Sequence, residues 1–369
     1  MAPLATAYSG PPKLTLARAF TEWRVDLPML VLILAAAAWY LLSARKVRRA
    51  GGQWGTGRSF AFIVLGLGFW AIATMAWPGV YESVLFYARA TQTVLLVLVA
   101  PLFLAMGKPL TLLIEASPAA GRRAERAVRS FPAKVLTFPA ITTLLLVAVP
   151  MTMYFTTWYT HVFSSDGLRE VTYLILMIPG YVFFWTLLRV DPVPKMYPYG
   201  VAMWITAAEV VGDAFFGIAI IADTNLIAGA HYQAVGYPFG PSLATSQVLG
   251  GGIIWILGDA VGLPFLAVQL IQMMREDKRE AATIDAELDA RDAARARRVA
   301  DSGSGTTVPA AAMSTPASPA TETSVPGVTS IAADVPAGVP VTTEADETGD
   351  ADRPWWETDP RLTNRFRQA

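Results

Sequence analysis

Long apolar runs separated by short polar segments make up the middle of the chain. A helix that crosses a lipid bilayer needs roughly 20 mainly apolar residues, and seven windows come close to or exceed that length. The pattern therefore predicts an all-α fold, a polytopic membrane protein built as a bundle of seven transmembrane helices. The windows lie at about 27–43, 60–77, 84–106, 135–158, 168–189, 200–222 and 248–274.

The chain changes character on both sides of the apolar runs. The region after the last window first alternates acidic and basic residues with much alanine, which is typical of a solvated helix. It then becomes rich in Ser, Thr, Pro, Ala and Gly, a composition that favours disorder. The predicted parts are an N-terminal extracytoplasmic segment 1–26, a transmembrane domain 27–274, a charged cytoplasmic helix 275–300, a disordered linker 301–349 and a C-terminal motif 350–369.

The C-terminal motif contains two adjacent tryptophans, Trp355 and Trp356. Such a pair is a candidate for binding a partner protein or the membrane interface. The alternative is a terminal segment without a function of its own.

Basic residues in the short loops predict the orientation. Five Lys or Arg residues follow the first window, six follow the third and two follow the fifth, whereas the other three loops contribute only Arg169. Because loops rich in Lys and Arg stay in the cytoplasm, the N-terminus is expected outside and the C-terminus inside.

Composition narrows the function. The chain of 369 residues is 54% hydrophobic and 16% charged, and its 29 basic residues balance 29 acidic ones, so we expect no nucleic-acid partner. It has no cysteine, which excludes disulfides and thiolate metal sites. The common hydrolase, phosphate-loop and zinc-protease motifs are absent, and we expect a protein that is not an enzyme.

Four ionisable side chains fall within the apolar windows: Arg89, Glu209, Asp213 and Asp259. A charge at bilayer depth is costly and needs a partner or a function. Glu209 and Asp213 are four residues apart and share a helix face, and Arg89 is expected to reach Asp213. These residues form either a structural ion pair between helices or an intramembrane polar seam for transport, protons or a ligand.

Glycines in the last window indicate close helix packing. Gly258 and Gly262 have the spacing that lets two membrane helices approach. We expect this face to lie against a neighbouring helix.

A metal site could use only a few donors. Copper(I) binds thioether sulfur and imidazole nitrogen, and the candidates in the outer half are Met151, Met153, His161 and His231. Methionines in apolar helices more commonly fill gaps in packing, so the sequence assigns no metal.

Several blocks, in order, resemble the CtaG-type cytochrome c oxidase assembly proteins in their actinobacterial form. The resemblance covers roughly residues 11–275, and its most specific block is Val99 to Pro109, with Pro101, Gly107 and Pro109. Other blocks are Trp23–Asp26, Trp39–Leu41, Arg49–Trp54, Arg58–Phe60, Gly180–Trp185, Val190–Pro192, Ala214–Gly217 and Gln247–Trp255.

The resemblance implies a multi-pass protein of the bacterial plasma membrane that acts in the respiratory chain, in copper supply to the oxidase. Histidines are the proposed copper ligands of that family, and here other residues replace them. Arg89 and Thr93 flank Gln92, Tyr173 and Ile175 precede the glycine of the fifth helix, Asp213 stands in the sixth helix, and Ser246-Gln247-Val248 replaces an acidic-Gln-Gln motif. No family metal ligand carries over, although copper is the cofactor that the resemblance implies.

We therefore expect an assembly factor that acts by contact with cytochrome c oxidase subunits in the lipid bilayer, with an Arg89–Asp213 ion pair in place of a metal. The first alternative is a transporter or channel-like protein that uses the polar seam. A scaffold that recruits partners through Trp355 and Trp356 is the second.

Overall fold

The computed structural model describes residues 8–195 and 197–303. The described residues form helices and turns and contain no strand, so the predicted all-α class is confirmed. By its internal contacts the chain divides into two units, residues 1–300 and 301–369. Most of the expected linker, and both Trp355 and Trp356, lie outside the described residues.

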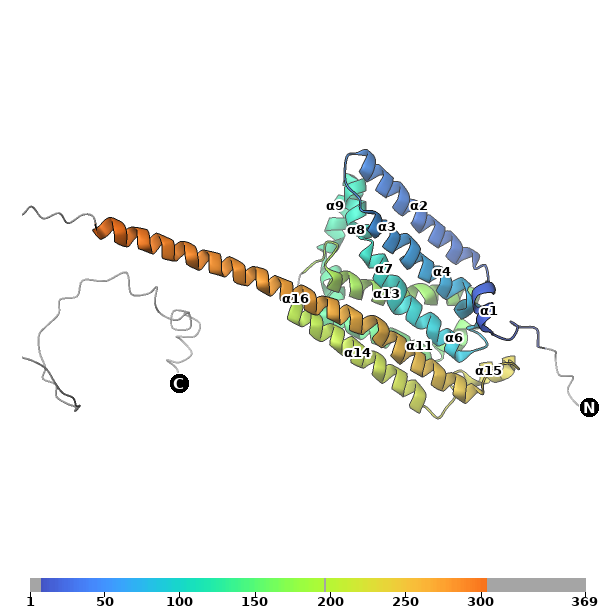
Figure 1. The fold of residues 1–369 in the computed structure, drawn as a ribbon. Coiled ribbons are helices and arrows are strands. Elements are labelled where there is room, and N and C mark those ends of the chain that lie inside the picture. The colour runs from blue at the N-terminus through green and yellow to red at the C-terminus, as the bar shows by residue number, and fades with distance from the viewer. Residues whose placement is uncertain (1–7, 196, 304–369) are drawn as a thin grey trace, which may run out of the picture. The chain divides into compact units, whose positions relative to one another are not determined.

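The longer elements supply the apolar helices, and shorter ones connect or extend them (Figure 1). The connecting helices are α1 (Leu16–Thr21), α9 (Pro118–Val128), α10 (Phe131–Leu136), α12 (Trp158–Val162) and α15 (Gly229–Val235). The others are α2 (Leu27–Arg49), α3 (Thr56–Phe60), η1 (Ala61–Leu67), α4 (Gly68–Met75), α5 (Trp77–Tyr81), α6 (Phe86–Val94), η2 (Leu95–Val99), α7 (Ala100–Met106), α8 (Pro109–Ala116), α11 (Pro139–Phe155), α13 (Asp166–Leu188), α14 (Tyr199–Ala222) and α16 (Leu243–Gly303).

Six helical stretches of the described chain are long and apolar enough to cross a membrane. The expected window 135–158 is the exception, because its helix α11 has 17 residues and is shorter than the others. A helix readily begins at a proline, whose missing N–H would be unpaired in the first turn anyway. Pro139 stands in this position, and residues 131–136 form the separate helix α10.

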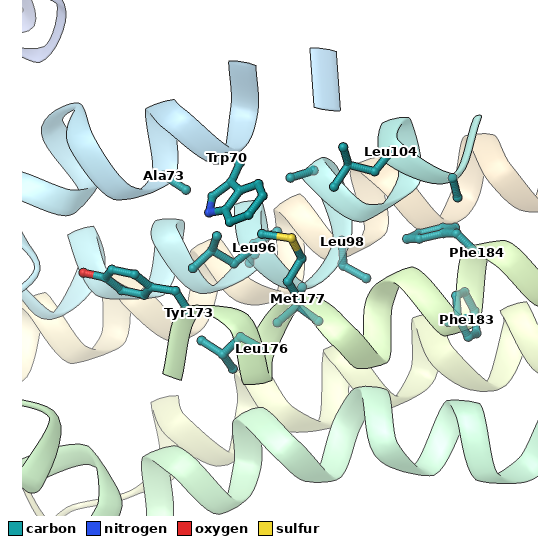
Figure 2. Packing of buried hydrophobic residues seen from close by; sticks show 14 of the residues in the cluster. Trp70, Ala73, Leu96, Leu98, Leu104, Tyr173, Leu176, Met177, Phe183 and Phe184 are labelled. Atoms are coloured by element: carbon teal, nitrogen blue, oxygen red, sulfur yellow. The ribbon is translucent and has the colours of Figure 1, made fainter. Parts of the chain in front are cut away.

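Buried side chains of α4, η2, α7 and α13 form the centre of the bundle. Figure 2 shows Trp70, Leu96, Leu104, Met177 and Phe184 packed together, and each is less than 9% exposed. Many large apolar side chains on the outer faces of the helices are exposed. That distribution fits a bundle with an apolar surrounding.

A π-helical stretch, η2, lies between α6 and α7 where two backbones approach. Pro101 has no N–H, so the Val97 carbonyl four residues earlier loses its usual helical partner. Gly180 of α13 lies against this carbonyl, and a Cβ at that position would stand 1.7 Å from the Val97 oxygen. Only glycine fits at position 180.

Helices α14 and α16 lie side by side (Figure 1), and glycines of both helices form their contact. A Cβ on Gly217 would stand 2.6 Å from the carbonyl oxygen of Gly251. The expected packing face of Gly258 and Gly262 also lies against α14. Beyond this contact α16 continues as one helix, and its charged residues 275–298 are exposed.

Candidate functional site

A buried carboxylate, Glu82, lies at the centre of a polar network at one end of the bundle. It sits in the four-residue connection between α5 and α6 and is 1% exposed. A charge removed from water in this way needs partners of opposite charge and hydrogen-bond donors. The chain supplies both from three different segments.

Three arginines and a tyrosine surround the Glu82 carboxylate. Oε2 accepts a hydrogen bond from Nη1 of Arg89 at 2.7 Å. Oε1 accepts from Nη2 of Arg24 at 3.0 Å and from the Tyr173 hydroxyl at 2.5 Å, and Nε of Arg169 lies 3.6 Å away. The carboxylate thereby joins α6, the segment before α2, and the first turns of α13.

The arginines outnumber the carboxylate. Asp166, which is exposed, pairs with Arg169 at 2.6 Å. Burial lowers the pKa of Arg24, and the Glu82 carboxylate more than reverses this, so the pKa lies above its ordinary value. The guanidinium groups stay charged, and the network keeps an excess of positive charge.

Arg89 is fully buried and holds two further groups of the core. Nη1 also donates to Oε1 of Gln92 at 2.7 Å, and Nη2 lies 3.2 Å from the sulfur of Met153. The Gln92 amide in turn donates to the Ala73 carbonyl at 2.9 Å. Arg89 therefore fixes α6 against α4 and α11.

The expected Arg89–Asp213 ion pair is wrong. Arg89 lies seven residues after Glu82 and turns its guanidinium to that carboxylate, which is closer along the chain. The expected polar seam accordingly separates into the Glu82 network and an acidic group of Glu209, Asp213 and Asp259 on α14 and α16. Asp213 lies against Gly258 of α16 and Glu209 against Gly262, which agrees with their predicted shared face.

Two buried tyrosines connect the backbone of Glu82 to α12 and α15. The hydroxyls of Tyr159 and Tyr232 lie 2.7 Å apart, and the Tyr232 hydroxyl donates to the Glu82 carbonyl at 3.3 Å. Burial raises the pKa of Tyr232, in α15, above its ordinary value, so its phenol remains neutral. His231 contacts the neighbouring Ser83 carbonyl through Nε2 at 2.9 Å.

The residues of the family-like blocks have structural partners. The Tyr40 hydroxyl donates to the Gly107 carbonyl at 2.7 Å, and a Cβ on Gly107 would clash with Phe62. Pro109 begins α8. Gln247 accepts from Ile227 N–H at 2.9 Å and donates to the carbonyls of Ile220, in the last turn of α14, and of Asp223 and Asn225, which follow that helix.

The candidate copper ligands have other contacts. Met153 lies against a guanidinium cation, and Met151 packs at the edge of the core. His161 is exposed and contacts its own helix through Nδ1, whereas His231 stacks on Phe163 with 4.0 Å between ring centroids. In the described residues no group of three His, Asp or Glu side chains could hold a metal.

Copper also fits poorly with the residues at the family's histidine positions. Arg89, Thr93, Tyr173 and Asp213 present a cation and oxygen donors, whereas copper(I) prefers sulfur and nitrogen. Arg89 and Tyr173 are already bound to Glu82. These side chains do not form a copper site.

Sequence reasoning missed Glu82, the residue on which the network depends. It lies at the boundary of an apolar window, where a carboxylate is unremarkable by hydropathy. The available signal was the spacing of seven residues between Glu82 and Arg89. Helical residues seven apart lie on the same face, so the two side chains can meet. Arg24 and Arg169 could not be assigned, since their contacts with Glu82 join segments far apart in the sequence.

Comparison with known proteins gives relatives among mycobacteria. Uncharacterized proteins of Mycobacterium bovis, Mycobacterium tuberculosis and Mycobacterium leprae are each 28% identical to this chain over 292 residues, which cover 76% of this chain and 44% of the relative. The chain therefore spans less than half of the length of these relatives. No solved structure matches it.

The family is shown by a model that covers most of the chain. The model of the cytochrome c oxidase caa3 assembly factor matches residues 38–276. This range runs from α2 into α16 and includes Glu82, Arg89 and the acidic group of α14 and α16. The chain belongs to the cytochrome c oxidase caa3 assembly factor family.

Proposed function

We propose that this chain is an integral protein of the bacterial plasma membrane that supports maturation of cytochrome c oxidase by contact with oxidase subunits, without catalysis and without a copper site of its own. Family membership and the six apolar helices support the membrane and assembly parts of this proposal. One observation supports the absence of a copper site. Arg89 and Tyr173 stand at positions where the resemblance implies copper ligands, and both bind the Glu82 carboxylate instead.

In this proposal α11 is the seventh membrane helix. Its 17 residues are at the lower limit for a spanning helix. The N-terminus is then outside, the charged part of α16 is cytoplasmic, and residues 301–349 are a disordered linker to the motif 350–369. The Glu82 network lies on the outer side, and Glu209 lies deeper in the bilayer.

Deletion of the gene tests the function. We expect cells without the chain to lose assembled cytochrome c oxidase, measured by the haem a absorbance of their membranes. The wild-type gene restores it, and so does a variant in which Met151, Met153, His161 and His231 are replaced by Leu, Leu, Gln and Gln. Unchanged oxidase in the deletion strain would contradict the proposed function, and failure of a folded, membrane-inserted variant would contradict the absence of a copper site.

Transport remains the second candidate, favoured by the buried Glu209 and the half-buried Asp213 and Asp259 within apolar helices. It predicts flux of a cation or proton in vesicles that contain the purified chain, with loss of flux in Glu209→Gln. Recruitment through Trp355 and Trp356 instead predicts that removal of residues 350–369 suffices to abolish oxidase assembly. An assembly factor that acts through the membrane domain predicts that this truncation retains function.

A further inference from the structure

Glu209 and Asp213 of α14 lie against α16, which itself carries Asp259. Glu209 is 1% exposed, and its Oε2 is buried without a hydrogen-bond partner. Asp259 likewise has a buried oxygen, Oδ1, without a partner. At 1.5 Å per residue, Asp213 lies about 13 Å from the end of α14, well within an apolar span.

Glycines of α16 press the neighbouring helix against these carboxyls. A Cβ on Gly258 would stand 2.4 Å from Oδ2 of Asp213, and one on Gly262 would stand 3.0 Å from Oε2 of Glu209. The carboxyls are thus enclosed by backbone, and any side chain at these two glycines would displace them.

No arginine or lysine neutralises this acidic group within the described part of the chain. The ionisable groups that act on Glu209 and Asp213 are these two carboxyls themselves and Asp259. Of the nearest elements, α11 carries Tyr154, whose hydroxyl contacts Thr93, and α6 carries Arg89, which binds Glu82. Ionised carboxyls without a counter-ion are very costly in an apolar interior.

Protons provide the neutralisation that the side chains lack. The buried Oε2 of Glu209 has no hydrogen-bond donor beside it, so an ionised carboxylate, which only accepts hydrogen bonds, would leave its charge uncompensated there, whereas a protonated carboxyl is neutral. A metal ion is a poorer explanation, because the described residues contain no cluster of three acidic or histidine side chains that could hold one.

A small cavity lies beside Asp213. A water molecule in it could exchange protons with the carboxyl group. Its volume is about 20 Å³, and Asp213, Thr93, Leu146 and Pro150 are among its lining residues. A cavity of this size holds one water molecule when two to four polar partners are present. Asp213 and Thr93 are the lining residues with polar side chains. The Thr93 hydroxyl donates to the Arg89 carbonyl and lies 3.0 Å from the Tyr154 hydroxyl, and its oxygen can accept a further bond.

The number of oxygens also favours water over a sodium ion. Two polar side chains line the cavity, and a buried water needs two to four polar partners. Hard cations in proteins take about six or more oxygen ligands, and the remaining lining residues, such as Val97 and Phe216, are apolar.

We propose that Glu209, which is buried, and the half-buried Asp213 form a proton-binding site that exchanges its proton through one water molecule beside Asp213. In each exchange the O–H bond of the carboxyl breaks, the proton moves to the water oxygen, and a proton of that water returns to the carboxyl. The charge of the site is therefore unchanged. The site is independent of the proposed role in oxidase assembly.

Infrared spectroscopy of the full chain in lipid bilayers tests this site. We expect the wild type at pH 7 to show the C=O band of a protonated carboxyl, and Glu209→Gln and Asp213→Asn each to reduce it. Asp223→Asn is the matched control, because Asp223 follows α14, lies outside the cavity and caps Asn225 through an oxygen that Asn retains. Its band should equal that of the wild type.

Exchange into D₂O tests the water. Thr93→Val removes one hydroxyl from the cavity, and we expect the carboxyl band to shift about fivefold more slowly, the effect of one ordinary hydrogen bond. Absence of a protonated carboxyl band in the wild type would overturn the proton site, as would its full retention in both Glu209→Gln and Asp213→Asn. An unchanged exchange rate in a folded Thr93→Val protein would overturn the water route.

Discussion

Glu82 illustrates how one residue can organise a buried region. Its carboxylate binds Arg24, Arg89 and Tyr173, which come from three segments. Removing one member of a buried ion pair costs more than the pair itself contributes, because an uncompensated charge remains. Glu82 compensates more than one guanidinium, so its loss is expected to affect the whole end of the bundle that contains it.

Glu82→Gln is expected to lower the free energy of unfolding by about 3–5 kcal/mol, since it leaves the buried Arg89 without a counter-charge. Thermal unfolding in detergent, followed by size-exclusion chromatography, measures this loss. Asp166→Asn removes the exposed carboxylate that pairs with Arg169 and should leave stability unchanged. Equal stability of Glu82→Gln and the wild type would contradict the role assigned to Glu82.

The sequence allowed part of the residue-scale picture to be predicted. Glu209 and Asp213 were placed on one helix face by spacing alone, and both do lie against glycines of α16. The partner of Arg89 was predicted wrongly because depth in the membrane was used without knowledge of the turn that contains Glu82. Side-chain direction in such a connection depends on tertiary structure.

At the scale of elements, backbone contacts hold the bundle together. The clearest is Gly180 of α13 against η2, where the carbonyl freed by Pro101 meets a residue without a side chain. The glycine and the proline were both noticed as members of family-like blocks. Their contact could not be predicted, because it depends on the π-helical stretch between α6 and α7.

Gly180→Ala is expected to destabilise the protein by about 1–3 kcal/mol or more, since the added methyl group would overlap the Val97 carbonyl and force the helices apart. Gly167→Ala is the control in the same helix, because nothing lies within 4 Å of its Cβ position. The midpoint of thermal unfolding should fall for the first variant only. Identical midpoints would show that α13 and η2 are not in this contact.

Asp191 is expected to stabilise the start of α8. It accepts hydrogen bonds from the N–H groups of Leu110 and Thr111 and from the Thr111 hydroxyl. Asp191→Ala should cost about 0.5–2 kcal/mol, as for loss of a helix cap. Faster hydrogen exchange of the first α8 amides would report it, with a smaller effect in Thr111→Val. Unchanged exchange in Asp191→Ala would contradict the capping role.

For the whole molecule, the apolar pattern was sufficient to predict the fold class. Helices occur at all seven windows, and six meet the length for a membrane span. The window that became α11 was drawn too long, because Pro139 separates it from α10 and hydropathy does not detect this boundary. Which helices pack together could not be read from the pattern.

The proposed orientation can be tested with single cysteines, because the native chain has none. Ser164→Cys, between α12 and α13, should react with a membrane-impermeant maleimide in cells with an intact plasma membrane. Ser130→Cys, between α9 and α10, should react only after the membrane is permeabilised. The reverse labelling pattern would place the N-terminus in the cytoplasm and refute the proposed orientation.

The central claim is that a charge network around Glu82, rather than copper, organises the end of the helix bundle at which it lies. The most direct measurement is the copper content of the purified full chain from copper-replete cells, determined by mass spectrometry. The account predicts far less than one copper per chain, with no change when Met153 and His231 are replaced. Stoichiometric copper that disappears in those variants would contradict it.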